Sequence, residues 1–258
     1  MKAFLLDIDG TTLLGSEALP GAVAFIDWLR AEGIPHLWMT NNTSRSRASW
    51  LARLEDAGLA PQPHELYTSG DATIEYLRAN HPDDRLYVVG PGELRADFEA
   101  AGLTLVEDEA DAVVLAYDVE LTYAKIERTA LLLQAGARFF ATHPDVTCPT
   151  PQGPIPDVGS FLAMFETACG RTATVIGKPE ATMVEGALAR LGIEARDAVM
   201  VGDRLATDVA MAVRAGLPAC LVRTGVTTDD DLAAADSAPD HVFDDLAAVH
   251  AWALSART

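Results

Sequence analysis

The chain has 258 residues, of which 49% are hydrophobic and 22% charged, a composition typical of a globular protein with one or two domains and a full core. Its formal net charge of −19 argues against nucleic acid or an anionic membrane as partner, because both require a positive protein surface. A small phosphorylated ligand is not excluded, since a metal ion and a few cationic side chains can reverse the sign of charge locally.

The cysteine pattern favours a reducing, cytoplasmic setting. The three cysteines are widely spaced and form no Cys-x-x-Cys pair, so neither a zinc site nor a disulfide framework is expected. Asp7 and Asp9 interrupt the N-terminal apolar stretch, which is unlike a signal peptide. No apolar run approaches the ~18 residues that a transmembrane helix requires.

The chain begins with an apolar run of about five residues that ends at two carboxylates, Asp7 and Asp9, with Gly10 directly after them. Carboxylates at the end of a buried strand are costly to desolvate unless a cation meets them. The pattern therefore indicates a metal ion, a basic side chain, or both, as the partner of these acids.

Helices and strands then alternate with short connections. Apolar spacing predicts a helix that opens at residues 20–21 and ends at Gly33, a strand at 35–39, a helix at about 45–57, a strand at 66–68 and a helix at 69–77. Such alternation predicts a parallel sheet with right-handed crossovers, whose ligand crevice lies beyond the carboxyl ends of the strands. Asp7 and Thr40 both stand at such ends.

A second α/β series follows a polar break at residues 80–84. The predicted strands and helices, in chain order, are 86–89, 93–101, 112–116, 123–135, 138–141 and 160–168. Residues 143–156 contain five prolines, which forbid a regular helix and limit strand pairing. A loop of this length is more often functional than idle. We interpret residues 80–172 as a second, inserted domain.

The final series returns to strands that end in polar residues. A strand at 174–176 precedes Lys178, and a strand at 198–201 runs into Asp203. Asp208 stands in the first turn of the helix that Gly216 ends. The remaining predicted elements are a helix at 181–191, a strand at 220–222 and a helix at 246–254.

Four strand ends match, in order, the four motifs of the haloacid dehalogenase (HAD) superfamily, which the chain resembles over essentially its whole length. The motifs read Asp7-Ile8-Asp9-Gly10-Thr11-Thr12, Thr40-Asn41-Asn42, Gly177-Lys178-Pro179, and Gly202-Asp203-Arg204-Leu205-Ala206-Thr207-Asp208. The long insertion lies between the second and third motifs. In this position it resembles the cap of the branch that contains NagD and the p-nitrophenylphosphatase, pyridoxal-phosphate and phosphoglycolate phosphatases.

This resemblance implies an α/β fold in which a Rossmann-like parallel-sheet core, residues 1–79 and 173–258, carries an inserted α/β cap domain at 80–172. It also implies Mg²⁺, held by the side chains of Asp7 and Asp203 and the backbone carbonyl of Asp9. Hard oxygen ligands suit this ion.

Phosphoryl transfer requires a nucleophile, charge neutralisation and a proton for the leaving oxygen. Asp7 is the candidate nucleophile and would form an aspartyl-phosphate. Residues i and i+2 of an extended strand share a face, so Asp9 is expected beside Asp7, where it protonates the leaving alcohol and later activates water.

The other motif residues are assigned to phosphate binding and support. Thr40 and Asn41 would contact the phosphoryl oxygens, and Lys178, one of three lysines, would neutralise Asp7 and the phosphoryl group. Asp208 is expected to orient Lys178 or a metal-bound water.

Some assignments stay open. Arg204 either reaches the substrate or covers the site. His143, Asp145 and Thr147 of the proline-rich loop are candidates for substrate selection, against the simpler interpretation that they only shape the loop.

The expected activity is Mg²⁺-dependent hydrolysis of small phosphomonoesters, such as nucleoside monophosphates, sugar phosphates or aryl phosphates. Alternatives are a dehalogenase or phosphomutase on the same core, or a phosphorylatable signalling module. Dehalogenases lack the second acid, mutases usually carry the cap after the first motif, and a signalling module needs neither Asp9 nor a cap. The physiological substrate and a homodimeric state are left open.

Overall fold

The computed structural model describes residues 2–150, 152–235 and 237–256. These residues pack into two units. The first unit contains the segments up to Thr40, Arg47–Tyr67 and from Lys178 onward, and the second contains Asn41–Ser46 and Thr68–Gly177. Each unit has a parallel sheet with helices against it, which confirms the predicted α/β fold class.

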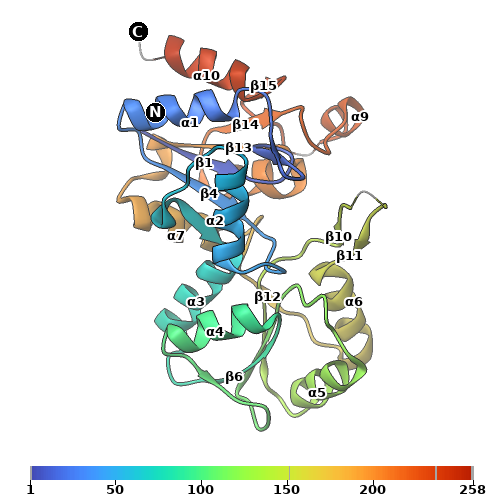
Figure 1. The fold of residues 1–258 in the computed structure, drawn as a ribbon. Helices are drawn as coiled ribbons and strands as arrows, with labels where there is room; N and C mark the ends of the chain where they lie inside the picture. The colour runs from blue at the N-terminus through green and yellow to red at the C-terminus, as the bar shows by residue number, and fades with distance from the viewer. Residues whose placement is uncertain (1, 151, 236, 257–258) are drawn as a thin grey trace. The chain divides into compact units, whose positions relative to one another are not determined.

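The first unit is built on a sheet with the strand order β15-β14-β13-β1-β4-β5 (Figure 1). Its strands are β1 (Ala3–Asp7), β4 (His36–Thr40), β5 (Leu66–Thr68), β13 (Ala198–Gly202), β14 (Ala219–Val222) and β15 (His241–Phe243). β1 pairs in parallel with both β13 and β4, and β14 pairs in parallel with β13 and β15. The carboxyl ends of these paired strands therefore meet along one edge of the sheet.

Every residue of β1 is buried, as expected for a central parallel strand that is covered on both faces. The helices of this unit are α1 (Ala22–Ala31), α2 (Arg47–Asp56), α7 (Ala181–Leu191), α8 (Ala210–Ala215), α9 (Asp229–Ala233) and α10 (Leu246–Ser255). α1 and α10 lie side by side and contribute to one apolar core with β1 (Figure 1). Trp38 and Trp50 are fully buried there, and Trp28 and Trp252 are partly buried against the same core.

The second unit has the strand order β12-β9-β8-β6-β7, with all four pairings parallel. Its strands are β6 (Arg85–Val89), β7 (Thr104–Leu105), β8 (Ala112–Leu115), β9 (Arg138–Ala141) and β12 (Thr174–Val175). Its helices are α3 (Ser69–Asn80), α4 (Gly92–Ala100), α5 (Tyr123–Gln134) and α6 (Val158–Cys169). Along β6, Leu86 and Val88 face the core of α3 and α4, whereas Tyr87 and Val89 face the core of α5 and α6.

The limits of the second unit differ from the expected limits of residues 80 and 172. Leu77 of α3 is fully buried in the same core as Leu86 and Phe98, so this helix packs with the second unit. At the other end, β12 extends the second sheet by pairing with β9. The limits of the second unit are thus set by the apolar contacts of α3 and by the pairing of β12 with β9. Neither feature is marked by a change of amino-acid composition along the chain.

Several short elements were not indicated by the sequence. Residues 13–19 form a hairpin of β2 (Leu13–Leu14) and β3 (Glu17–Ala18), where only a connection is expected. In the proline-rich loop, β10 (Thr147–Cys148) pairs antiparallel with β11 (Ile155–Pro156). Two-residue strands are too short to show a hydrophobic period, so pattern analysis cannot detect them. Among the described residues, no helix has both the length and the apolar character needed to cross a membrane.

Replacing Leu77 by alanine should weaken the second unit selectively. The change removes a fully buried side chain from the core of α3, α4 and β6 and should cost about 2–5 kcal/mol. Amide hydrogen exchange should accelerate in β6 and β8 but stay unchanged in β1 and β13. Leu29→Ala, in the core of the first unit, is the matched control and should give the reverse pattern. Faster exchange in β1 for Leu77→Ala would assign α3 to the first unit.

Candidate active site

Parallel pairing brings two of the predicted site acids, Asp7 and Asp203, to one edge of the first sheet. Asp7 is the last residue of β1, and Asp203 follows the last residue of β13. The strands are neighbours in register, with Leu6 opposite Val201. Carboxylate oxygens of Asp7, Asp203 and Asp208 all lie within 4.8 Å of one another. Asp7 and Asp203 are nearly 200 residues apart in sequence, and the order of the strands in the sheet brings them together.

Lys178 enters this cluster as its cation. Its Nζ donates to Oδ1 of Asp208 at 2.8 Å and also to Oδ1 of Asp7. The side chains of Lys178 and Asp208 are only 3% and 1% exposed. Nζ also lies 3.4 Å from the carbonyl oxygen of Met39 in β4. A buried ammonium is tolerated only where hydrogen-bonded carboxylates surround it, as they do here.

The cluster is short of positive charge. Three carboxylates and the ammonium of Lys178 carry a formal charge of −2 between them. Burial raises the pKa of Asp7 well above its usual range, Lys178 opposes this, and Asp208 and Asp203 reinforce it. Burial, followed by repulsion from Asp208, raises the pKa of Asp203 to about 6. Although burial alone would lower the pKa of Lys178, the carboxylates of Asp208 and Asp7 outweigh it and raise that pKa.

Three glycines allow the backbone to approach these acids. A Cβ on Gly225 would lie 1.8 Å from Oδ2 of Asp203, and a Cβ on Gly10 would lie 2.6 Å from the same atom. Gly10 also has a φ of +90°, which side-chain-bearing residues rarely adopt. A Cβ on Gly202 would lie 2.3 Å from Cβ of Asp208. Any larger residue at these positions would displace an acid of the cluster.

The loop after β14 holds Asp203 and was not assigned a role from the sequence. The backbone N–H of Val226 donates to Oδ2 of Asp203 at 2.9 Å, and the Thr227 hydroxyl donates to its backbone oxygen at 2.6 Å. The Thr224 hydroxyl donates to the carbonyl of Gly10 at 2.6 Å. The sequence did contain a signal for this loop. The apolar strand at 220–222 is followed by the polar residues 223–225, and each of the four motifs likewise follows an apolar strand.

The donor set fits a hard divalent cation. Asp7 and Asp203 supply carboxylate oxygens at one point, and hard cations prefer such oxygen ligands. Asp208 is engaged at both oxygens, by Lys178 at Oδ1 and by the backbone N–H of Arg204 at Oδ2, 3.1 Å away. Asp208 is thus in contact with Lys178, as the first of its two expected roles requires.

Asp9 stands outside the buried cluster. β1 ends at Asp7, and Asp9, two residues later, forms an isolated bridge with Leu13. The Asp9 carboxylate, 39% exposed, instead accepts a hydrogen bond from Arg53 of α2 at 2.7 Å. Arg53 carried no signal in the sequence beyond its place in an amphipathic helix.

Thr40 and Asn41 fall on either side of the division between the units. Thr40 closes β4 and is buried, and Asn41 begins the second unit. Nδ2 of Asn41 donates to Oδ2 of Asp145 at 3.2 Å, and its backbone oxygen accepts from Ser69 at 2.8 Å. One candidate of the proline-rich loop, Asp145, is therefore bound to a candidate phosphate-binding residue.

The other loop candidates differ in their surroundings. His143 is fully buried, with Nδ1 3.0 Å from the Thr142 hydroxyl and Nε2 3.0 Å from Oδ1 of Asp157. Ligand atoms of His143, Asp145 and Asp157 lie within 4.8 Å of one another, but both ring nitrogens of His143 already have partners. Thr147 on β10 is exposed.

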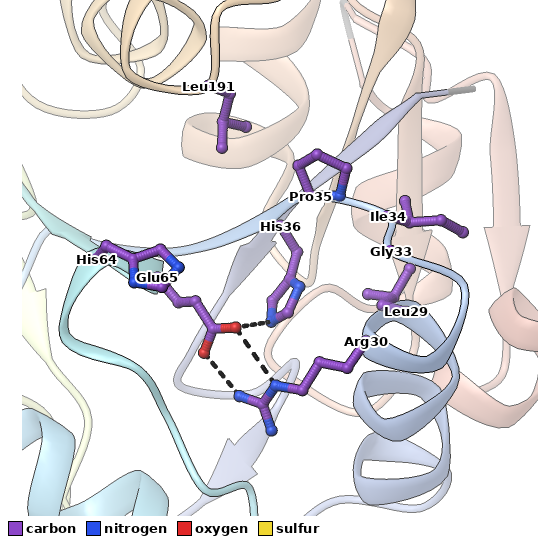
Figure 2. A pocket seen from close by; sticks show the side chains of 9 residues that line it. All are labelled: Leu29, Arg30, Gly33, Ile34, Pro35, His36, His64, Glu65 and Leu191. Carbon is purple, nitrogen blue, oxygen red and sulfur yellow. Dashed lines mark hydrogen bonds and ion pairs between the residues drawn. The ribbon is translucent and has the colours of Figure 1, made fainter.

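A separate cavity of about 260 Å³ lies at the opposite edge of the first sheet, where β4 begins at His36. Figure 2 shows Arg30 and His36 directed at the carboxylate of Glu65. Nη2 of Arg30 lies 2.6 Å from Oε2, and Nε2 of His36 lies 3.4 Å from Oε1. Burial lowers the pKa of His36. The cavity contains none of the predicted site residues.

Two family models of HAD-like hydrolases and a curated relative match this chain. Residues 4–104 match a family model of haloacid dehalogenase-like hydrolases, and residues 175–249 match a HAD-hydrolase-like model. An acid sugar phosphatase of Staphylococcus haemolyticus is 36% identical over 246 residues, which cover 95% of this chain and 94% of the relative.

Two solved structures are similar to nearly the whole chain. The 4-nitrophenylphosphatase of Thermotoga maritima superposes with a TM-score of 0.94 at 36% identity and covers 97% of each chain. NagD of Escherichia coli K-12 superposes with a TM-score of 0.90 at 30% identity and covers 96% of this chain and 97% of its own.

In metal-free protein, the Asp203→Asn variant should gain stability relative to the wild type as the pH rises from about 4 to 7. The native carboxyl keeps its proton up to a pKa of about 6, whereas the unfolded chain releases it near 3.8, so wild-type stability falls with rising pH in this window. The difference corresponds to on the order of 3 kcal/mol.

Urea unfolding in the presence of a chelator measures this difference. The side-chain amide of the Asp203→Asn variant accepts a weaker hydrogen bond from the Val226 N–H than a carboxylate does. This loss of stability in the variant does not itself depend on pH. Asp27→Asn, an exposed residue of α1, is the control and should show no trend. A constant stability difference from pH 4 to 7 would contradict the raised pKa.

Proposed function

Because the chain belongs to the haloacid dehalogenase-like hydrolases, among the NagD-like phosphatases, we propose that it hydrolyses small phosphomonoesters with Mg²⁺ and through an aspartyl-phosphate on Asp7. The observation that carries this proposal is the buried cluster of Asp7, Asp203 and Asp208 around Lys178. A nucleophilic carboxylate held by an ammonium, with excess negative charge for a divalent cation, is what phosphoryl transfer to a carboxylate requires.

The proposed substrates are sugar phosphates and aryl phosphates. Relatives named an acid sugar phosphatase and a 4-nitrophenylphosphatase support these two classes. Nucleoside monophosphates remain a third candidate. The relatives reported above give no support to a dehalogenase, a phosphomutase or a signalling module.

In the first step, one oxygen of Asp7 attacks phosphorus while Lys178 holds the other. The bond from phosphorus to the leaving oxygen breaks, and Asp9 transfers its proton to that oxygen, which releases an alcohol or phenol. In the second step, a water molecule attacks phosphorus and gives a proton to Asp9. The bond between phosphorus and Asp7 then breaks, which frees phosphate and restores the carboxylate.

Mg²⁺ held by Asp7 and Asp203, with the backbone carbonyl of Asp9, would neutralise charge on the phosphoryl group. Asp208 keeps Lys178 directed at Asp7 through its 2.8 Å ion pair. Thr40, Asn41 and Arg204 are proposed to bind phosphoryl oxygens.

The second unit is proposed to act as the cap domain that selects the leaving group, through Asp145 and Thr147 of its proline-rich loop. His143, which is buried with Asp157, would shape that loop and leave substrate contact to its neighbours. A cytoplasmic location, a homodimeric state and the lack of nucleic-acid and membrane partners stay predictions.

Asp7→Asn should abolish turnover while leaving the fold intact. The amide keeps the size of the side chain but cannot attack phosphorus, so kcat should fall by about 10³-fold or more. A screen of sugar, nucleoside and aryl phosphates with and without Mg²⁺ measures this loss. Asp27→Asn should match the wild type. Activity above a few per cent of wild type in Asp7→Asn would refute the nucleophile assignment.

Removal of the metal should stop the reaction and lower the Tm at pH 7. A divalent cation offsets the −2 charge of the buried cluster, so it should bind the folded protein and stabilise it by mass action. The Tm increment on adding Mg²⁺ should shrink below pH 6, because Asp203 then binds a proton instead. Full turnover in excess chelator would count against the metal site.

A further inference from the structure

Arg53 links the proposed acid to the hairpin that follows it. Its Nη2 donates to Oδ1 of Asp9 at 2.7 Å, and its Nε donates to the carbonyl of Gly15 at 2.8 Å. Gly15 lies in the turn between β2 and β3. One guanidinium on α2 therefore holds both the Asp9 carboxylate and the tip of the hairpin.

The position of this guanidinium is itself restrained. It lies over the ring of Trp50, with its carbon 4.9 Å from the ring centroid, and Trp50 is fully buried in the core of the first unit. The Arg53 side chain is only 17% exposed. A planar fork with two acceptors and an aromatic face keeps one orientation better than a flexible ammonium would. Arg53 thus transmits the rigid position of α2 to Asp9.

Asp9 has need of such a support. It follows the end of β1 by two residues, its backbone is paired only by an isolated bridge to Leu13, and its carboxylate is 39% exposed. A general acid contributes only when it lies within hydrogen-bond reach of the oxygen that it protonates. Arg53 contacts the carboxylate of Asp9 and not its backbone carbonyl, so its loss should affect the protonation step more than the attack by Asp7.

We propose that Arg53 is a positioning residue that holds Asp9 for protonation of the leaving group, and that it thereby sets how far the enzyme accepts phosphate esters of basic leaving groups. This proposal rests on the proposed phosphatase function. Esters such as sugar phosphates release a strongly basic alkoxide unless a proton arrives, whereas nitrophenolate is a stable anion that leaves without one. Loss of Arg53 should accordingly penalise the first class and spare the second.

The test is a series of substituted phenyl phosphates of similar shape, from p-nitrophenyl phosphate to phenyl phosphate, together with the sugar phosphate that the wild type hydrolyses fastest. The quantity measured is kcat/KM, which reports the steps up to leaving-group release. For Arg53→Met, kcat/KM should stay within about threefold for p-nitrophenyl phosphate. It should fall about tenfold or more for phenyl phosphate and the sugar phosphate, a part of the 10²–10⁴-fold that general acid catalysis supplies.

A double-mutant cycle separates positioning from general damage. In the Asp9→Asn background, Arg53→Met should reduce kcat/KM for phenyl phosphate no further, because the residue that it positions is already gone. Arg53→Lys keeps the charge but cannot hold both acceptors as a fork, so it should restore part of the loss. This variant also keeps the test usable if Arg53→Met folds poorly.

Arg30 provides the matched control within the same unit. It likewise pairs with a carboxylate, that of Glu65 (Figure 2). It also donates to the backbone carbonyl of Leu59 at 2.8 Å and lies over the indole of Trp38. Arg30→Met removes the same kinds of contact at the cavity where β4 begins. It should lower the Tm at least as much as Arg53→Met, but the dependence of kcat/KM on the leaving group should remain that of the wild type.

Two failures are distinguishable. If the wild type hydrolyses none of these esters with Mg²⁺, the phosphatase proposal falls and the role of Arg53 falls with it. If the wild type is active but Arg53→Met loses the same factor on every ester, or adds a further loss to Asp9→Asn, Arg53 is only a structural residue and the positioning proposal is wrong.

Discussion

The ammonium of Lys178 between Asp7 and Asp208 is the interaction on which the rest of the first unit depends. Moving a charge of either sign from water into the protein costs several kcal/mol, and the cost is recovered only while each charge keeps its partner. The positions of Asp7 at the end of β1, of Lys178 and of Asp208 relative to one another must therefore be kept. The same cluster is short of positive charge, so a bound cation should stabilise the fold.

Close backbone approach is the second constraint. Gly10, Gly202 and Gly225 leave room for Asp203 and Asp208 where any Cβ would collide with them. With the hydrogen bonds from Val226 and Thr227, this packing fixes the acids before any ligand arrives. A site preorganised in this way need not reorganise its dipoles during the reaction. Asp9 is different, since an isolated bridge to Leu13 holds its backbone and an ion pair with Arg53 of α2 holds its side chain.

Much of the architecture is predictable because its signals are local. Apolar runs that end in polar residues located β1, β4 and β13, and glycine stops located the ends of α1 and α8. The α3 boundary was not predictable, since Leu77 packs with Leu86 and Phe98 through contacts that no composition change marks. The two short hairpins were not predictable either, because a strand of two residues cannot show an alternation of apolar and polar side chains.

The sequence by itself determined that the chain is an α/β protein with acids, a lysine and polar turns at successive strand ends, because each such feature is encoded within a few neighbouring residues. The family resemblance implied that Asp7, Asp203 and Lys178 act together, but only the tertiary structure decided through which contacts they meet. Strand order placed Asp203 beside Asp7, and burial turned Lys178 from a charged residue into the partner of two carboxylates. It also paired Asp9 with Arg53, 44 residues away. Such pairings depend on packing between elements, and no local pattern records them.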